Sequence, residues 1–86
     1  NNSSWHAVRR ATLDVYPDGD AAKANIMPLT ELKPSPAFEK IIDAAGGGHA
    51  ATVENPADLP KAIEKALDAV RSGTPAVLNV LTGGRA

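Results

Sequence analysis

Hydrophobic residues along this chain follow a helical period in some segments and a strand-like pattern in others. The first helical segment covers residues 5–16, where one face is formed by residues three and four positions apart: Trp5, Val8, Thr12 and Val15. Pro17 cannot continue a helical hydrogen-bond ladder, and the Asp-Gly pair that follows it favours a turn. We therefore expect a short amphipathic helix that ends before Pro17.

Residues 17–36 show no clear period, and prolines interrupt the segment repeatedly: Pro28, Pro34 and Pro36. A connection of this length without regular structure is uncommon in a compact domain and is often a lid or a binding segment. A linker that merely crosses the surface is the alternative. The pattern leaves both interpretations open.

A second helix is expected over residues 35–45. Ser35 is a candidate N-cap, and Pro36 suits the first helical position. An apolar stripe at helical spacing follows: Phe38, Ile41, Ile42 and Ala45. The run Gly46–Gly48 supplies the left-handed residue that a helix C-cap favours. We interpret it as a helix stop rather than a phosphate loop, because it follows a helix and does not open one.

The next segments predict a strand and a third helix. Residues 49–54 suggest a short strand with Ala51 and Val53 on one face. Asn55 is a candidate cap, with a proline in the first turn after it. The apolar stripe of this helix is the most regular in the chain: Leu59, Ala62, Ile63, Ala66, Leu67 and Val70. The pair Ser72–Gly73 is expected to end it.

Residues 76–81 form an almost uninterrupted apolar run, which is typical of a strand buried on both faces. Strand, helix and buried strand in succession predict a closing βαβ unit over residues 49–82, with parallel strands and a right-handed crossover. A two-stranded parallel sheet has two open edges, so we expect the last strand to belong to a wider sheet. The pattern indicates an α/β chain that closes a larger domain.

Composition narrows the class of protein. The chain has 86 residues, nine basic against ten acidic side chains, a net charge of −1 and no cysteine. A chain this short buries only about 60% of its unfolded surface, and no disulfide adds stability. Neither charge forms a block, which disfavours nucleic acid and anionic membranes as partners. No apolar run approaches a membrane span and no segment resembles a signal peptide, so we expect a soluble, cytoplasmic chain.

Four stretches of the chain occur in an order that resembles the C-terminal end of thiamine-diphosphate-dependent enzymes: "NNSSW", "PAFEKIIDAAGG", "TVENPADLPKAIEKAL" and "GTPAVLNVLT". The similarity is greatest to the acetolactate synthase, pyruvate oxidase and decarboxylase group and runs over nearly the whole chain. Each stretch is unspecific alone, and their order carries the resemblance. It implies a terminal fragment (helix, loop, helix, βαβ) of a parallel-sheet domain that binds thiamine diphosphate.

The resemblance also implies a role for the first residues. Asn2 would give its side-chain oxygen to Mg²⁺ and Ser4 its backbone oxygen, both being the hard ligands that this ion prefers. Asn1, Ser3 and Trp5 would line the diphosphate pocket, with the N–H groups of the following helix directed at the same anion. A polar chain end without function is the alternative interpretation of the Asn-Asn pair.

His6 is the histidine that follows these residues directly. A catalytic role is possible for it, but an ordinary position in the first helical turn is the preferred interpretation, because no partner group is visible. Arg9 and Arg10 are expected to form a solvated helix face. No residue of the chain is assigned as catalytic on the sequence alone.

Other parts implied by the resemblance lie outside the chain. The aspartate of a Gly-Asp-Gly motif would precede residue 1, as would the strand that ends in the Asn-Asn pair. The glutamate that activates the thiazolium ring would belong to another domain, usually of a second subunit. We therefore expect the isolated chain to be inactive and the parent to be a homo-oligomeric lyase or transferase.

The parent reaction expected from the resemblance is decarboxylation of, or carboligation from, a small-molecule 2-keto acid. A family member of the oxalyl-CoA or benzoylformate decarboxylase type is one alternative. A non-catalytic α/β binding or interaction module is another, from a different class. The partners expected of the chain are the remainder of its parent and a second subunit, with no nucleic acid and no membrane.

Overall fold

The computed structural model describes residues 1–24, 26 and 29–83. They divide into two compact units, one formed by Asn1 with Ala37–Thr82 and the other containing Asn2–Pro36. Pro28, one of the prolines that interrupt the irregular segment, lies outside the described residues. Within them, no helix combines the length and the apolar character needed to cross a membrane.

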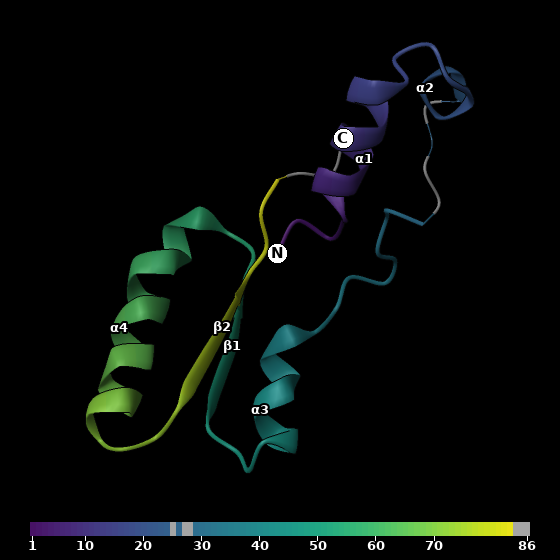
Figure 1. The fold of residues 1–86 in the computed structure, drawn as a ribbon. Coiled ribbons are helices and arrows are strands. Elements are labelled where there is room, and N and C mark those ends of the chain that lie inside the picture. Colours follow the sequence, from purple (N-terminus) through teal and green to yellow (C-terminus); the bar gives the residue numbers. More distant parts are fainter. Residues whose placement is uncertain (25, 27–28, 84–86) are drawn as a thin grey trace. The chain divides into compact units, whose positions relative to one another are not determined.

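The larger unit is a βαβ arrangement with an additional helix. Its elements are η1 Phe38–Lys40, α3 Ile41–Ala44, β1 His49–Val53, η2 Pro56–Asp58, α4 Leu59–Arg71 and β2 Ala76–Val80. The strands β1 and β2 are parallel, with His49 opposite Ala76 and Val53 opposite Val80. Figure 1 shows α4 and α3 on opposite sides of this sheet. The predicted α/β fold, with parallel strands joined through a helix, is confirmed.

The core of this unit is small, and it lies against β1. Among the described residues, the buried hydrophobic side chains are Ile42 of α3 and Val53 of β1. Along β1, Ala51 is half-buried whereas Ala50 is exposed, which confirms the predicted alternation. Within these residues β2 is half-buried except at Asn79, because the η1–α3 segment and α4 cover a sheet of two strands. Burial of both its faces in a wider sheet stays a prediction.

Glycines end α3 as the sequence predicts. The backbone N–H of Gly47 donates to the carbonyl of Ile42 at 2.7 Å, and that of Gly46 donates to Asp43 at 3.3 Å. Gly46 has a φ of 111°, so this pair of bonds is a Schellman motif with glycine in the left-handed position. The expected N-cap at Ser35 is wrong, since the helical turn begins at Phe38 with Ala37 before it and no side-chain cap.

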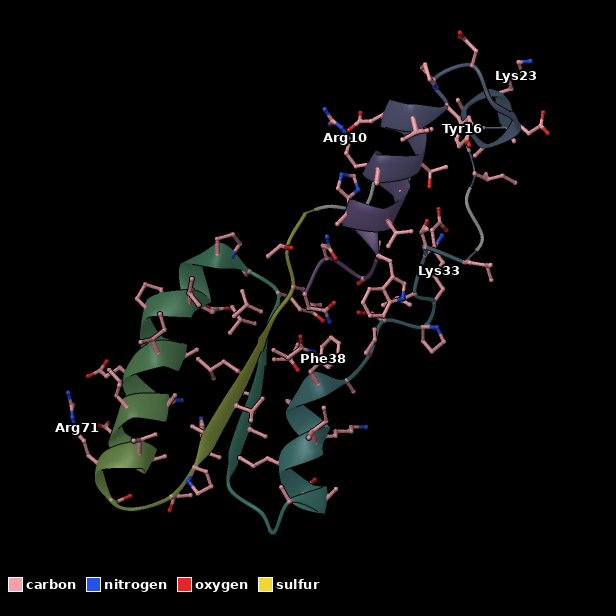
Figure 2. All side chains as sticks on the ribbon, viewed as in Figure 1. Arg10, Tyr16, Lys23, Lys33, Phe38 and Arg71 are labelled. Carbon is pink, nitrogen blue, oxygen red and sulfur yellow. The ribbon has the colours of Figure 1, made fainter. Side chains whose placement is uncertain are left out.

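Both ends of α4 match their sequence signals. The side chain of Asn55 accepts a hydrogen bond from the Ala57 nitrogen at 3.0 Å and caps η2, which continues directly into α4. At the other end Gly73 has a φ of 90°, and the Thr74 nitrogen donates to the Ala69 carbonyl at 2.9 Å. Figure 2 shows Arg71 near this end, where its side chain extends away from the sheet.

The apolar stripe of α4 is wider than the surface that it covers. Leu59, Ala62 and Ala66 are half-buried, whereas Ile63 and Leu67 are exposed although the same pattern predicted them as core-facing. A sheet of two strands is narrower than the stripe, so part of the apolar face has no covering among the described residues.

The smaller unit contains α1 His6–Val15 and α2 Asp20–Ala24. The first helix is confirmed, but its predicted apolar face is open: Trp5, Val8 and Val15 are exposed. The helix α2 was not predicted, since its five residues are too few to establish a period. Arg10 of α1 pairs with Asp14 at 3.3 Å with both side chains in solvent, as expected (Figure 2).

Candidate functional site

The first residues of the smaller unit form a tight turn at the head of α1. The Asn2 side-chain oxygen accepts a hydrogen bond from the Ser4 backbone nitrogen at 3.2 Å. Between them, Ser3 has a φ of 57°, which lies in the left-handed region that non-glycine residues seldom adopt. An asparagine side chain that bonds the backbone two residues later stabilises such a turn. The sequence Asn-Ser-Ser therefore folds locally so that the Asn2 carboxamide turns back over Ser4.

A segment far along the chain braces this turn. The Trp5 nitrogen donates to the Thr30 carbonyl at 2.7 Å, and the Leu32 nitrogen donates to the Ser3 carbonyl at 2.8 Å. These bonds make Ser4 and Glu31 an antiparallel bridge. The part of the irregular segment around Thr30 thus pairs with the turn. Both interpretations of the irregular segment, a lid or binding segment and a surface linker, stay predictions.

The head of α1 is suited to an anion. Trp5 occupies the N-cap position, and its side chain makes no capping hydrogen bond to the first turn. The hydroxyl oxygen of Ser4 is shielded from solvent and has no hydrogen-bond partner among the described residues. First-turn N–H groups and a hydroxyl close to the positive end of the helix dipole are the groups that bind phosphate oxygens.

Asn1 belongs to the larger unit, where it continues the sheet. Its nitrogen donates to the Val80 carbonyl at 2.7 Å, and its carbonyl accepts from the Thr82 nitrogen at 2.8 Å. This is the pattern of a parallel bridge opposite Leu81. The Leu81 nitrogen itself donates to Val53 of β1, so Asn1 occupies the other edge of β2.

The side chain of Asn1 is held as well. Its amide nitrogen donates to the Asn79 side-chain oxygen at 3.1 Å, and the Asn79 amide nitrogen donates to a carboxylate oxygen of Glu39 at 2.8 Å. The Asn79 hydrogen bond, more than any other interaction, lowers the pKa of Glu39. A negative charge is thereby stabilised at the end of a polar chain that leads to Asn1.

Comparison with known proteins decides the family. The family model described as "Thiamine pyrophosphate enzyme, C-terminal TPP binding domain" matches residues 1–80. The chain belongs to this family. Its fold is accordingly part of a domain that binds thiamine diphosphate, as the order of its sequence stretches predicted.

Curated relatives of this thiamine pyrophosphate enzyme domain come from mycobacteria. They are a "Probable acetolactate synthase" of Mycobacterium bovis (strain ATCC BAA-935 / AF2122/97) and the "Acetolactate synthase large subunit IlvG" of Mycobacterium tuberculosis (strain ATCC 25618 / H37Rv). Each is 43% identical over 54 residues, which is 63% of this chain and 9% of the relative. No solved structure matches the chain.

The residues at the head of α1 fit the cofactor of this family. Asn2 offers an amide oxygen with a second lone pair beyond the one that faces Ser4, and Ser4 adds a backbone carbonyl and a hydroxyl. In the described part of the chain, no cluster of three or more His, Cys, Asp or Glu side chains is placed to hold a metal.

The other predicted site residues differ in position. Ser3 lies within the turn, Trp5 is 58% exposed at the head of α1, and His6 is the exposed first residue of that helix. Asn1 stands on β2, held by its backbone and side chain. Their contacts with a cofactor stay a prediction.

Sequence reasoning missed two residues linked to Asn1. Asn79 was counted as part of an apolar strand, and Glu39 was not singled out. The signal for Asn79 was the single polar residue in the run Ala76–Leu81, since an asparagine inside a buried strand needs hydrogen-bond partners. Glu39 carries no comparable signal, because acidic residues are common in first helical turns.

Proposed function

We propose that this chain supplies the diphosphate- and Mg²⁺-binding turn of a thiamine-diphosphate-dependent enzyme that acts on a 2-keto acid. The observation that carries the proposal is the turn Asn2–Ser4, which holds an amide oxygen at the head of α1 in a chain of this family. The two relatives named acetolactate synthase favour carboligation or decarboxylation of that substrate.

In this proposal the residues of the turn bind and orient the cofactor. The Asn2 side-chain oxygen and the Ser4 carbonyl coordinate Mg²⁺, and the Ser4 hydroxyl and the first-turn N–H groups of α1 bind diphosphate oxygens. Neutral ligands suit this position, because they add no negative charge beside the phosphates. Thiamine diphosphate, when bound, supplies the carbanion chemistry at the substrate carbonyl.

The proposal includes partners beyond this chain. A negatively charged metal ligand would come from the rest of the parent protein. The group that activates the cofactor ring would come from a second copy of that protein. We accordingly propose a homo-oligomeric enzyme of the cytoplasm whose small-molecule substrate is a 2-keto acid such as pyruvate.

A pair of matched variants tests the metal role. Asn2 and Asn55 both accept a hydrogen bond from the backbone nitrogen two residues later, at 3.2 and 3.0 Å. Asn2→Ala and Asn55→Ala therefore remove the same group and the same type of bond. In the complete protein, Asn2→Ala should weaken Mg²⁺-dependent binding of thiamine diphosphate at least about tenfold, the usual effect of losing a group that holds a metal. Asn55→Ala should leave that affinity unchanged.

Calorimetric titration of the complete protein with thiamine diphosphate, with and without Mg²⁺, measures this affinity. Product analysis with pyruvate then separates carboligation, which yields acetolactate, from simple decarboxylation, which yields an aldehyde. Absence of cofactor binding by the unsubstituted protein would overturn the proposal. Equal affinities of the two variants would remove Asn2 from the metal site and leave the family assignment intact.

A further inference from the structure

Asn79 is a buried polar residue with two side-chain partners from distant parts of the chain. It lies on β2, in the sheet position opposite Thr52, and is 5% exposed. Its amide nitrogen donates to Glu39 at 2.8 Å, and its oxygen accepts from the Asn1 amide nitrogen at 3.1 Å. A buried carboxamide in a strand is costly unless it is hydrogen-bonded, so these contacts account for its presence there.

The Glu39 carboxylate determines the direction of this hydrogen-bond chain. An ionised carboxylate only accepts hydrogen bonds, so Asn79 must present its NH₂ group to Glu39. The Asn79 oxygen then faces Asn1, which in turn must present its own NH₂ group. A charge at Glu39 thus selects one of the two orientations of each carboxamide.

Glu39 is itself held against the sheet. Besides the Asn79 bond, a side-chain hydrogen bond with Thr52 lowers the pKa of Glu39, and Lys40 acts in the same direction by its charge. Thr52 and Asn79 are opposite each other in β1 and β2. The hydrogen bond with Asn79 at 2.8 Å is the contact that holds the Glu39 carboxylate at this position of the sheet.

The backbone of Asn1 is fixed at the same point. Its bonds with Val80 and Thr82 hold its main chain on the edge of β2, while Asn79 holds its side chain. Asn1 is joined by a peptide bond to Asn2, the proposed metal ligand. We propose that Asn79, oriented by Glu39, is a positioning residue that fixes Asn1 for the binding of thiamine diphosphate. This inference rests on the proposed function.

Two measurements on the complete protein test the role. The first is the dissociation constant of thiamine diphosphate with saturating Mg²⁺. The second, made without cofactor, is hydrogen–deuterium exchange at the Thr82 amide, which donates to the Asn1 carbonyl at 2.8 Å and so reports on Asn1 itself. Asn79→Leu should weaken cofactor binding about tenfold and accelerate this exchange about tenfold, as expected when one buried hydrogen bond is lost.

Variants at Glu39 keep the test decisive if Asn79→Leu does not fold. Glu39 is half-buried and lies in the short η1 segment rather than in a strand, so Glu39→Leu should fold. It removes the group that orients Asn79 and should change both quantities severalfold in the same direction. Glu39→Gln retains an oxygen that accepts from Asn79 and should restore most of the affinity. The turnover number at saturating cofactor should be the same in all three variants.

Val53→Ala is the matched control. It destabilises the same strand pair, because Val53 is buried in β1, but its side chain takes no part in the hydrogen bonds that join Asn1, Asn79 and Glu39. It should lower the melting temperature without a change in cofactor affinity. The positioning role is wrong if Asn79→Leu and Glu39→Leu bind the cofactor as tightly as the unsubstituted protein. It is also wrong if Val53→Ala loses as much affinity as they do for the same loss of stability. In both cases the proposed function stands. If the unsubstituted protein binds no cofactor, both are overturned.

Discussion

The side-chain oxygen of Asn2 lies 3.2 Å from the backbone nitrogen of Ser4 and accepts its hydrogen. This bond orients the carboxamide before any ligand arrives, so the ordering of that side chain need not be achieved during binding. In this turn the residue between the two, Ser3, adopts a left-handed backbone with a φ of 57°. An oriented oxygen and a costly backbone conformation therefore occur together in three consecutive residues.

Ser3 is therefore sensitive to the shape of its side chain. Ser3→Val places a β-branched residue at a φ of 57°, a conformation that costs a non-glycine residue of this kind about 1–2 kcal/mol. We expect about a tenfold loss in affinity of the complete protein for thiamine diphosphate, measured by calorimetric titration. Ser3→Gly removes the same hydroxyl but accepts the conformation, so it serves as the control and should bind more tightly than Ser3→Val. The opposite order would show that the turn is not required in this form.

Gly48 is predicted to be irreplaceable for a different reason. A Cβ atom at this position would lie 2.5 Å from the Pro75 carbonyl oxygen and would also overlap the Ile42 side chain. The Pro75 backbone cannot move away without loss of a hydrogen bond, because its carbonyl accepts from the His49 nitrogen at 2.9 Å. This bond lies at the start of the pairing of β1 with β2. Gly48→Ala should destabilise the strand pair by about 2 kcal/mol or more, the range of an overpacked core.

Gly47→Ala is the control, because a Cβ atom at Gly47 would meet no atom within 4 Å. Its only cost is the strain of a non-glycine residue at a φ of 95°. Hydrogen exchange at the His49 amide measures the difference, and Gly48→Ala should exchange clearly faster than Gly47→Ala. Equal rates would mean that the close approach to Pro75 relaxes without cost.

The Asn55 cap gives a smaller and well-defined prediction. Asn55→Ala removes the acceptor for the Ala57 nitrogen, and loss of such a cap costs about 1 kcal/mol. Exchange of the Ala57 amide should accelerate about fivefold in the complete protein. Asn55→Asp keeps an acceptor at this position, and its Ala57 amide should exchange at the original rate. An unchanged Ala57 exchange rate in Asn55→Ala would contradict the capping role.

Local signals predicted most of the fold. Gly46 and Gly73 end their helices where the sequence places them, and Asn55 begins one, because each acts within a few residues of its own position. Ser35 failed as a cap because its hydroxyl bonds Ser3, 32 positions away in the sequence, at 2.7 Å. The helix it was expected to cap starts at Phe38 instead. The preference of a residue for a cap position depends on its sequence neighbours, so it cannot predict a hydrogen-bond partner that is distant in the sequence.

The candidate site shows the same division. The turn at Asn2 is encoded by adjacent residues and was accessible through the resemblance to a family. The link from Asn1 through Asn79 to Glu39 joins positions 78 and 40 residues apart, and no period or motif connects them. The prediction that Ile63 and Leu67 face the core was wrong for a related reason. Periodicity identifies an apolar face of a helix but not the width of the surface that covers it.

Glu39 makes the larger unit sensitive to acid. Hydrogen bonds, the one with Asn79 first, lower the pKa of Glu39 below its ordinary value of 4.5 in the folded protein. A carboxyl group whose folded pKa is lowered stabilises the fold fully above its unfolded pKa, and this stabilisation is lost as the pH falls through the folded pKa. Exchange of the Thr82 amide should therefore accelerate as the pH is lowered below 4.5, after correction for the intrinsic rate. In Glu39→Gln, which has no charge to lose, the corrected rate should stay constant over that window, and a parallel acceleration would assign the acid sensitivity to other carboxylates.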